Sequence, residues 1–267
     1  MDYKLPSLPK RDENSNKGTF GKVLNIAGSE YMPGAAYLSS ISALKIGAGY
    51  VQLLSNKSVL NIVATHAPEI VLSDSVKNIN FREYSVVSFG CGCGVSEETK
   101  DKLFILYDKR DNIPTIIDAD GLNMLSEYNF EFDKNTVLTP HPKEASRLLG
   151  CDITDILKNP IKSAKDISKK YNCITVLKSH NTIVTDGNTL YKNSTGCSAL
   201  AKAGSGDVLC GMIAGLIAQN MDIFDAAALG VYLHGLTGDI AAENLSEYGV
   251  LASDLLRYIP FAIKIIQ

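Results

Sequence analysis

Two spacings of apolar residues alternate along the chain, and they predict strands joined by helices. Short continuous apolar runs that end in glycine or polar residues are typical of strands buried on both faces. Longer stretches in which apolar residues recur every three or four positions are typical of helices that pack on a sheet. Strands are expected over residues 23–27, 50–54, 69–72, 85–89, 114–118, 136–139 and 173–177. Helices are expected over residues 32–45, 97–108, 122–126, 143–149, 161–171, 208–218, 224–242 and 252–266.

This alternation predicts an α/β fold with a mostly parallel sheet flanked by helices on both faces. A small hairpin is expected over residues 182–184 and 189–191, because Asp186 and Gly187 split two β-prone runs. The chain then becomes all-helical. We find no repeat or linker and expect one domain over residues 1–267, in which the polar residues 1–16 form an N-terminal arm.

Composition narrows the class of protein. The 267 residues are 45% hydrophobic and 21% charged, as in ordinary globular proteins. A net charge of -3 without a basic block argues against a nucleic-acid partner. The start resembles no signal peptide, and the apolar stretch at 208–218 is too short to span a bilayer. The six cysteines form no CxxC pair, so we interpret them as free thiols in a reducing cytoplasm rather than as a zinc site.

The segment whose residues most clearly suggest a reaction is the glycine-rich turn at residues 203–207, which precedes an apolar helix. Gly204 and Gly206 permit backbone conformations closed to other residues, and Ser205 is expected as the helix N-cap. Unpaired N–H groups at a helix N-terminus attract phosphate. A carboxylate such as Asp207 is an unusual neighbour for phosphate unless it accepts a proton from a hydroxyl. Taken alone, the turn at residues 204–207 is better explained as a loop and cap before a core helix; the remainder of the chain favours the functional interpretation.

Further polar residues follow the ends of predicted strands. In a parallel sheet these ends open on one edge, where ligands bind. They carry Gly28 and Ser29, the glycine-rich loop 90–94, Asp118 and Asp120, His141, and Lys178 with Ser179 and His180. The sequence therefore predicts that these residues share one edge of the sheet with the helix that starts near residue 205.

Two of these groups have structural alternatives. The loop 90–94 lacks the full GxGxxG spacing, so it is weak as a dinucleotide fingerprint and also fits a tight turn. Asp118 and Asp120 point to opposite faces if the backbone is extended. A turn or cap role therefore suits them better than a direct metal pair, and a water-mediated Mg²⁺ contact stays open.

Structural or surface roles also fit four of the polar residues, namely His141, Glu144, Lys178 and His234. His141 is held between two prolines, which suits either a substrate contact or a structural role. Glu144 lies in a first helical turn, where the helix dipole favours a carboxylate. Lys178 directly follows an apolar strand and fits either a phosphate contact or an exposed surface lysine. His234, in a helix of small residues, is expected to be structural.

The motifs, in chain order, resemble one known family. They are KGTFGKV from Lys17, AGS from Ala27, PGAA from Pro33, GAG from Gly47, GxGxG from Gly90, DAD from Asp118, LTPHPxE from Leu138, VLK from Val176, NxTG from Asn193, LAKxGxGD from Leu200 and YLHG from Tyr232. Their order and spacing, over about residues 17–260, resemble the ADP/ATP-dependent NAD(P)H-hydrate dehydratases of the ribokinase-like superfamily. PGAA together with TPHP distinguishes this family from the sugar and vitamin kinases of the superfamily.

The resemblance implies repair of nicotinamide cofactors whose reduced ring has taken up water. ADP or ATP phosphorylates the ring hydroxyl of the S-form hydrate, phosphate leaves, and NADH or NADPH is restored. Mg²⁺ accompanies the phosphates. By resemblance Asp207 is the catalytic base and also contacts substrate. The anion hole and nucleotide site comprise Gly204, Ser205, Gly206, Lys178, Ser179, His180, Asn181 and Thr182, and the hydrated cofactor is contacted by Ala35, Gly92 and His141.

The chain departs from the family pattern in two loops. Ser179 stands where relatives often have glycine, and Cys91 and Cys93 occupy a loop in which proline is usual. Residues 1–267 also carry no epimerase domain, so the resemblance implies a separate NAD(P)H-hydrate epimerase for the R form. It further implies a homo-oligomer such as a tetramer, and the small-residue helix 226–242 fits a place either inside the monomer or between subunits.

Two other functions compete with the repair activity. The same fold fits an ATP-dependent kinase for a small hydroxymethyl compound such as a vitamin precursor. It also fits a nucleotide-binding protein without catalysis. The sequence does not choose between ADP and ATP, or between NADH hydrate and NADPH hydrate.

Overall fold

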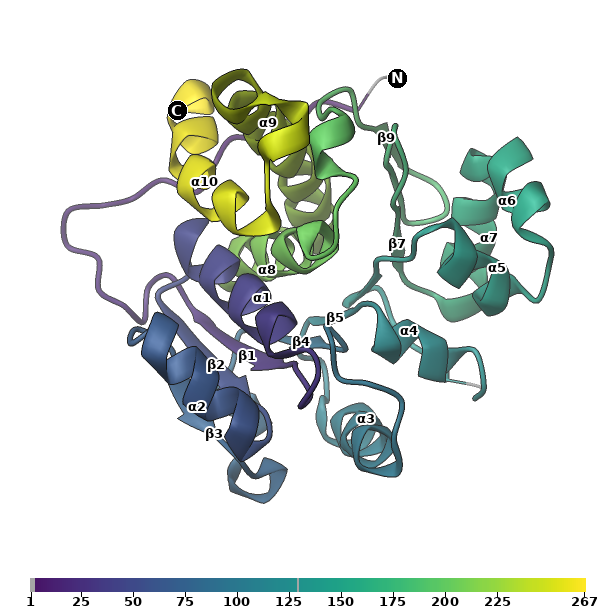
Figure 1. Ribbon diagram of the computed structural model, residues 1–267. Coiled ribbons are helices and arrows are strands. Elements are labelled where there is room, and N and C mark those ends of the chain that lie inside the picture. Colours follow the sequence, from purple (N-terminus) through teal and green to yellow (C-terminus); the bar gives the residue numbers. More distant parts are fainter. Residues whose placement is uncertain (1–2, 129) are drawn as a thin grey trace.

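A sheet of nine strands forms the centre of the molecule (Figure 1). The computed structural model describes residues 3–128 and 130–267. Strand order is β3-β2-β1-β4-β5-β6-β7-β8-β9; β1 to β7 run parallel, and β8 and β9 are antiparallel additions. The strands are β1 Lys22–Ile26, β2 Tyr50–Leu54, β3 Val71–Ser73, β4 Val86–Phe89, β5 Thr115–Ile117, β6 Thr136–Leu138, β7 Ile174–Leu177, β8 Ile183–Thr185 and β9 Leu190–Lys192.

Helices connect the strands and complete the chain. The α-helices are α1 Pro33–Lys45, α2 Lys57–His66, α3 Glu97–Lys109, α4 Asp120–Leu125, α5 Pro142–Leu149, α6 Ile153–Lys158, α7 Pro160–Tyr171, α8 Ser205–Ala218, α9 Ile223–Gly249 and α10 Ala252–Ile266. Short 3₁₀ helices are η1 Val76–Asn78, η2 Phe81–Glu83 and η3 Ser198–Leu200.

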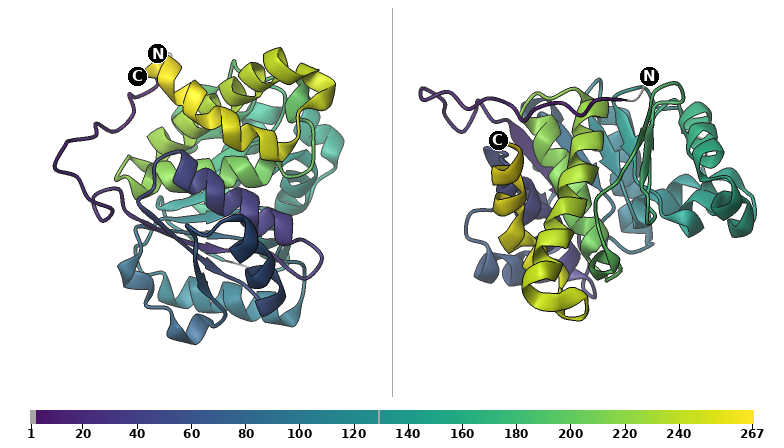
Figure 2. Two further views of the ribbon diagram at one scale, coloured as in Figure 1. Left: turned by 60° about the vertical axis from the view of Figure 1, so that its left-hand side comes forward. Right: turned by 90° about the horizontal axis from the view of Figure 1, so that it is seen from above.

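The helices cover the sheet on both faces, as predicted (Figures 1 and 2). One hydrophobic core joins the sheet to α1, α2 and α8–α10, and a second joins it to α3–α7. Consecutive strand residues enter opposite cores: Val86 belongs to the first and Val87 to the second. This alternation follows from the two-residue period of a strand. The near-continuous apolar strand runs are therefore explained by burial on both faces.

Helix α8 lies at the centre of the first core, packed against α1. A Cβ at Gly211 would approach the backbone oxygen of Ser39 to 2.0 Å, so only glycine permits this contact. On its other side α1 meets a buried polar group: the Asn25 amide donates to the hydroxyls of Ser39 and Ser40 at 2.8 Å, and Ser88 donates to Asn25 at 2.9 Å. Because buried polar groups must be paired, these bonds fix α1 on the sheet and thereby position α8.

Three helical features differ from the prediction. Helices α2 and α6 were not expected; Asn56 and Asp152 cap them by accepting from backbone N–H groups. Helix α9 continues to Gly249, beyond the apolar pattern that ends near residue 242. Ser246, with φ of 66°, interrupts its regular geometry. The small-residue segment 226–242 was expected either inside the monomer or between subunits. It packs inside the monomer, since Ala226, Ala227 and their neighbours on α9 are buried in this single chain.

Residues 3–21, as described, form turns but no helix or strand, and they cross the outside of the molecule (Figure 2). The Tyr3 ring packs edge-on against Phe224, with centroids 5.0 Å apart. The Arg11 guanidinium donates to the Gly47 oxygen and lies 3.9 Å from the Phe20 ring centroid. The arm is therefore attached through Tyr3 near its start and through Arg11 in its middle.

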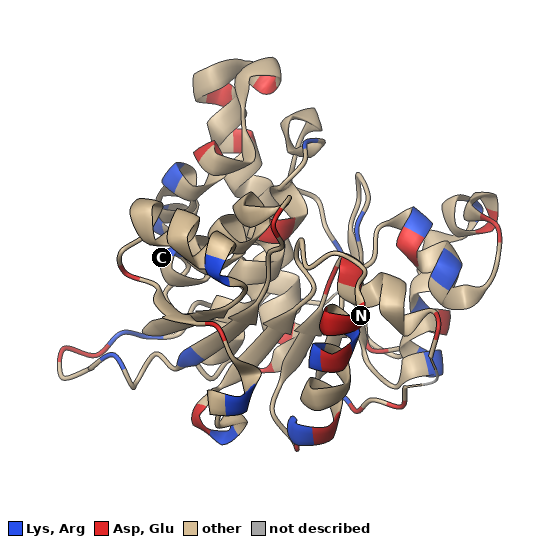
Figure 3. Ribbon diagram, turned by 60° about the horizontal axis from the view of Figure 1, so that its bottom comes forward, with Lys and Arg blue, Asp and Glu red and all other residues tan. Residues whose placement is uncertain are grey.

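Charged residues of both signs are dispersed around the molecule (Figure 3). In the described part of the chain, no helix combines the length and apolarity needed to cross a bilayer.

Candidate active site

Loops at the carboxyl ends of the parallel strands meet at one edge of the sheet, as predicted. The Gly28 amide donates to the Cys91 oxygen at 2.8 Å, which joins the ends of β1 and β4. The Gly94 amide donates to Asp120 at 2.8 Å, which joins β4 to β5. The Lys178 amide donates to the Pro140 oxygen at 2.8 Å, which joins β7 to β6.

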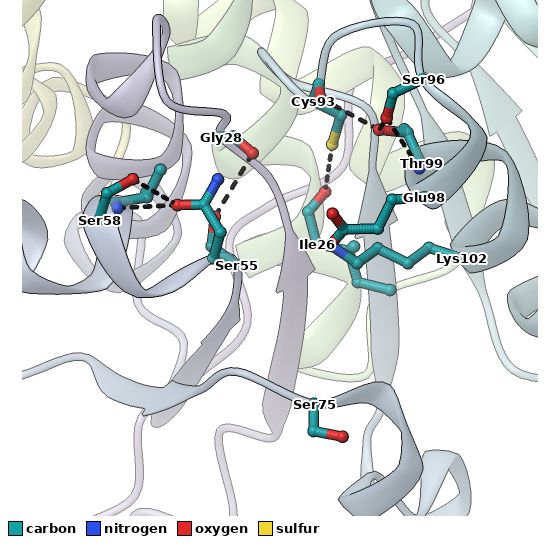
Figure 4. A network of polar contacts seen from close by, with 12 residues as sticks. Ile26, Gly28, Ser55, Ser58, Ser75, Cys93, Ser96, Glu98, Thr99 and Lys102 are labelled. Carbon is teal, nitrogen blue, oxygen red and sulfur yellow. Dashed lines mark hydrogen bonds and ion pairs between the residues drawn. The ribbon is translucent and has the colours of Figure 1, made fainter.

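The loop 90–94 is held by hydrogen bonds on both sides (Figure 4). The Cys93 thiol donates to the Ile26 oxygen at 3.3 Å, and Thr99 donates to the Cys93 oxygen at 3.1 Å. Gly92 lies against α1, since a Cβ there would approach the Ala35 Cβ to 2.6 Å. Ala35 and Gly92, both predicted to contact substrate, are therefore neighbours in the structure.

The N-terminus of α8 differs from the prediction in its cap residue. Gly204 occupies the N-cap with a left-handed φ of 91°, a conformation that favours glycine. Ser205 is the first helical residue, and its side-chain oxygen lies 3.1 Å from His234 Nε2 on α9. Burial lowers the pKa of His234 to about 4, so this ring is neutral at pH 7. The prediction of Ser205 as N-cap is wrong, and the structural role expected for His234 agrees with its burial.

Two backbone amides at this helix start point outward. Ser205 N donates to the Lys202 oxygen and Val208 N to the Gly204 oxygen. Among residues 3–128 and 130–267, no acceptor meets the amides of Gly206 and Asp207. They lie at the positive end of the helix dipole and are free to bind an anion.

A cavity of about 740 Å³ opens beside these amides. Seven residues of the predicted site line it: His141, Lys178, Ser179, His180, Thr182, Ser205 and Gly206. Asn181 does not; its side chain donates to the Asn193 oxygen at 3.3 Å, and it lines a smaller neighbouring cavity of about 270 Å³. The residues assigned to the nucleotide are thus largely gathered in one place.

Several residues of this wall were not assigned from the sequence, although the NxTG motif contains three of them. They include Asn193, Thr195, Gly196, Ser198, Leu200 and Lys202. Thr195 donates to the Tyr232 oxygen at 2.8 Å, and the Gly196 amide donates to Asp239 at 2.9 Å. These bonds shape the segment between β9 and α8 against α9.

The turn at residues 202–204 separates this cavity from a second one of about 520 Å³. Lys202 lines both, and Tyr37, Leu38 and Ala252 line only the second. As described, Ala35, Gly92 and Asp207 line neither of the two. The predicted substrate residues Ala35 and Gly92 are thus not on the same wall as His141.

Lys178 forms an ion pair with Asp118 at 2.6 Å, below the α8 N-terminus. A Cβ at Gly206 would lie 3.4 Å from the Lys178 Nζ, so the ammonium rests against the glycine turn. Burial favours the neutral amine, but the charges of Asp118 and Glu144 outweigh it and raise the pKa of Lys178. The alternative of an exposed surface lysine is therefore wrong, because the side chain is largely covered.

Asp207 is partly buried in the first turn of α8, near Asp118. Burial, followed by the charge of Asp118, raises the pKa of Asp207 to about 6; a hydrogen bond from Cys91 and the charge of Lys178 oppose this shift. A carboxylate with this pKa is ionised at pH 7 and is close to the range that suits a general base.

Glu144 and His141 form a capping box at the start of α5. The His141 amide donates to Glu144 Oε2 at 2.8 Å, and His141 Nδ1 accepts from the Lys143 and Glu144 amides. Burial raises the pKa of Glu144 to about 7 against the opposing charge of Lys178. Burial and Lys178 lower the pKa of His141. Glu144 is therefore more than a dipole-favoured surface residue.

Fold and site together define an α/β protein of the ribokinase-like class. A ribokinase-like superfamily protein from Enterococcus faecalis V583 matches 97% of this chain and 92% of its own, with 26% identity and a TM-score of 0.86. The sequence pattern of the Carb_kinase family, described as NAD(P)H-hydrate dehydratase, matches residues 23–261. The chain belongs to the NAD(P)H-hydrate dehydratase family.

Named relatives agree with this membership. The ADP-dependent (S)-NAD(P)H-hydrate dehydratase of Neisseria meningitidis serogroup B is 35% identical, over 92% of this chain and 86% of that protein. The crystal structure of the Bacillus subtilis ADP/ATP-dependent NAD(P)H-hydrate dehydratase, co-crystallized with ATP/Mg²⁺, has a TM-score of 0.88 and 29% identity, and covers 98% of this chain and 95% of that one.

Longer relatives also match. The bifunctional NAD(P)H-hydrate repair enzyme Nnr of Coxiella burnetii is 35% identical over 96% of this chain. The chain spans about half the length of the bifunctional relatives, 53% in that case.

Proposed function

We propose that this chain catalyses the ADP- or ATP-dependent dehydration of S-form NAD(P)H hydrate to NAD(P)H. The observation that carries the proposal is the start of α8, where the Asp207 carboxylate lies beside two free backbone amides and near the Lys178 ammonium. Family membership and the names of the relatives support the choice of substrate.

In the proposed reaction the phosphate donor occupies the 740 Å³ cavity. Lys178, with the segment that ends at Thr182, holds the donor, and the turn at residues 204–206 binds the phosphoryl group. Asp207 accepts the proton of the ring hydroxyl while the hydroxyl oxygen bonds to phosphorus and the bond to the leaving nucleotide breaks. Backbone N–H groups stabilise the charge on the transferring group without reorganising. No covalent intermediate with the protein is needed.

The phosphorylated ring then loses phosphate. Its carbon–oxygen bond breaks and a ring proton departs, which restores the double bond of the reduced nicotinamide. Ala35, Gly92 and His141 are the proposed contacts to the hydrated cofactor. Ala35 and Gly92 pack together on the α1 side of the site, and His141 lies on the α5 side. A substrate that touches all three must cross the edge of the sheet between them.

Mg²⁺ suits the proposed site as a companion of the donor's phosphates. Asp118 is already paired with Lys178, and Asp120 already accepts from the Gly94 amide. Their remaining oxygens fit contacts to a hydrated ion, since Mg²⁺ keeps several of its waters in such sites. When bound, Mg²⁺ supplies charge neutralisation at the phosphates. The Lys178 ammonium and the free backbone amides also stabilise the negative charge of these phosphates.

We further propose the setting in which the enzyme works. One dehydratase domain acts on the S form in the cytoplasm, and a separate epimerase converts the R form. The chain assembles as a homo-oligomer. The free state of all six cysteines is in keeping with a reducing compartment.

The activity is tested by incubating the protein with NADH hydrate, ADP and Mg²⁺ and following the absorbance of reduced nicotinamide. The proposal predicts that this absorbance returns only when nucleotide is present; ATP and NADPH hydrate are tested in parallel. No return with either nucleotide would contradict the proposal. A stable phosphorylated alcohol formed from ATP and a hydroxymethyl vitamin precursor, with no return of absorbance, would indicate the small-molecule kinase instead.

A further inference from the structure

Three buried side chains from separate parts of the chain converge below the start of α8. They are Cys91 in the loop after β4, Asp118 at the end of β5, and Cys210 one turn beyond Asp207 on α8. Their two sulfur atoms and a carboxylate oxygen all lie within 4.8 Å of one another. Relative exposure is 1% for Cys91, 1% for Asp118 and 0% for Cys210. No sequence motif indicates this group, because its members are far apart in the chain, and the six cysteines were expected to be free thiols rather than zinc ligands.

The three side chains face one another because of how their elements pack. Cys210 lies on the face of α8 that is turned towards the sheet, with its sulfur within 4.8 Å of the Cys91 sulfur, and Cys91 and Asp207 are close enough for each to affect the pKa of the other. Both cysteines are free. The two thiols and two carboxylates are thus in one contiguous group.

Asp118 has an oxygen available to this group. Its Oδ1 accepts from the Lys178 ammonium at 2.6 Å and from the Ala119 amide at 2.8 Å. Within the described residues no protein donor is hydrogen-bonded to Oδ2, which would lie 4.0 Å from a Cβ at Gly206. Gly206 lines the large cavity, so the path from solvent to the group passes this glycine and the partly exposed Asp207.

We propose that Cys91, Cys210 and Asp118 form a binding site for a soft divalent cation of the Zn²⁺ class, directly beside Asp207. Thiolate and carboxylate are common zinc ligands at about 2.0–2.3 Å from the ion, which places tetrahedral ligands roughly 3.5–4 Å apart. The observed separations need only a small contraction to reach that geometry. The donor set disfavours Mg²⁺, a hard cation that prefers oxygen ligands.

Binding of the metal ion is accompanied by loss of protons from the two thiols. Each thiol releases one proton to solvent as its sulfur bonds to the metal, and Asp118 contributes a carboxylate oxygen. No oxidant is needed. The fourth ligand position is open to the Asp207 carboxylate or to water.

The site predicts inhibition, a consequence that depends on the proposed role of Asp207. A cation bound to Cys91, Cys210 and Asp118 attracts the Asp207 carboxylate and competes with the substrate hydroxyl for it. It also weakens the contact between Asp118 and Lys178, which supports the proposed donor site. Zn²⁺ should therefore inhibit the dehydratase while Mg²⁺ sustains it.

The test measures metal binding on the intact chain, with reductant and excess Mg²⁺ present. Equilibrium dialysis with Zn²⁺ should give one tightly bound ion per chain. Titration with Cd²⁺ should give the ultraviolet absorption of cadmium thiolate. In Cys210→Ala and Cys91→Ala the affinity should fall by at least ~10-fold. Cys151→Ala, which removes an exposed cysteine outside the group, should bind like the wild type. Circular dichroism and thermal unfolding establish that each variant is folded.

Equal Zn²⁺ affinity in the wild type and both site variants would overturn the proposal and assign the ion to other ligands. Absence of cadmium–thiolate absorption in the wild type would overturn it without reference to any variant. Inhibition that persists unchanged in both variants would place Zn²⁺ on the donor's phosphates and would also count against the site. Tight binding that depends on both cysteines but leaves turnover unaffected would support the cation site and contradict the role of Asp207.

Discussion

At the residue scale, the groups proposed to bind phosphate and to accept the proton lie together at the start of α8. Gly204 provides a left-handed φ, Gly206 leaves room for the Lys178 ammonium, and Asp207 carries a carboxylate whose pKa is raised to about 6, chiefly by burial. The residue at each position therefore meets a different physical requirement. Gly204 provides the backbone angle, Gly206 provides the space, and Asp207 provides the charge.

Gly206→Val tests the anion site. A Cβ at this position lies 3.4 Å from Lys178 Nζ, and the further methyl groups of valine extend into the space proposed for the phosphoryl group. We expect nucleotide affinity, measured by calorimetry, to fall by about tenfold or more, since a lost charge-assisted hydrogen bond is worth about 1.5–3 kcal/mol. The control is Gly18→Val, at an exposed position without a left-handed φ that precedes β1 and so lies at the opposite edge of the sheet, which should leave affinity unchanged. Unchanged affinity in Gly206→Val would contradict the phosphate assignment.

Asp207→Asn should change stability in a pH-dependent way. The folded chain holds the Asp207 proton more tightly than the unfolded chain, whose ordinary pKa is 3.8. This contribution to stability is fully present below about pH 4 and is lost as the pH rises through about 6. At pH 8 the variant should therefore be more stable than the wild type by about 1–2 kcal/mol after allowance for solvent screening. At pH 4 the two should be nearly equal.

Urea unfolding at the two pH values measures this difference. The control is Asp101→Asn, at an exposed position on α3, which should show no comparable gain at pH 8. A variant less stable than the wild type at pH 8 would mean that the Asp207 carboxylate makes a stabilising structural contact.

At this scale the sequence predicted identities better than contacts. The motifs assigned Asp207, Lys178 and His141 to the site; the structure places Lys178 and His141 on the wall of one cavity, and the roles of all three stay predictions. The Lys178–Asp118 pair, the Ser205–His234 contact and the Cys91–Cys210 pair were not predicted, because each joins residues from different elements. Ser205 was assigned as N-cap from its residue type, whereas the position requires a left-handed φ that glycine adopts more readily.

At the scale of elements, the position of α8 depends on close packing with α1 and α9. Gly211 faces the backbone of α1, and Gly230 of α9 faces Ile213. This explains why α8 is apolar on all sides, a pattern that indicates a helix in the interior. Its N-terminus reaches the sheet edge because α1 itself is fixed by Asn25 and its serine partners.

Gly211→Ala tests this packing. Its Cβ would lie 2.0 Å from the Ser39 oxygen, a backbone atom that cannot rotate away, so α1 and α8 must separate. We expect a loss of about 1–3 kcal/mol in the free energy of unfolding, the usual cost of overpacking. Gly34→Ala, in the first turn of α1 with open space around it, should change stability by less than about 1 kcal/mol. Equal stability of the two variants would contradict the packing account.

The elements that the sequence predicted correctly share strong local signals. Buried strands appear as uninterrupted apolar runs, α8 as a longer apolar run after a glycine-rich turn, and α10 as a segment with clear helical spacing of its apolar residues. Helix α2 was missed although Val59, Leu60 and Val63 have helical spacing, because its β-branched residues weaken its helix propensity, and α6 was missed because it has only six residues. The caps Asn56 and Asp152 mark their starts. Such a cap is recognisable only once the backbone geometry is known.

At the scale of the whole molecule, the parallel sheet places loops from five strands on one edge, and this much followed from the alternation of patterns. The separation of Ala35 and Gly92 from the wall that contains His141 did not follow, because it depends on how the loops pack: Ala35 and Gly92 lie against each other beside α1 and line neither cavity, whereas His141 lines the 740 Å³ cavity. A single chain also leaves apolar side chains exposed on α10, including Phe261 at 56% and Ile265 at 64%.

These exposed residues lead to a prediction about assembly. Phe261 and Ile265 lie one helical turn apart and share a face of α10, which suits burial against another subunit. We expect light scattering to show a homo-oligomer, and Phe261→Glu to shift it towards smaller species. Ile62→Glu, at an exposed apolar position on α2, is the control and should not. A wild-type monomer at working concentration would refute the predicted assembly.

The most direct test of the central claim is the turnover of Asp207→Asn with NADH hydrate and ADP, measured by the return of reduced-nicotinamide absorbance. Turnover is expected to fall by ~10²–10⁴-fold, the usual contribution of a placed base, while ADP affinity stays close to that of the wild type. Near-normal turnover in this variant would remove Asp207 from the mechanism and contradict the account.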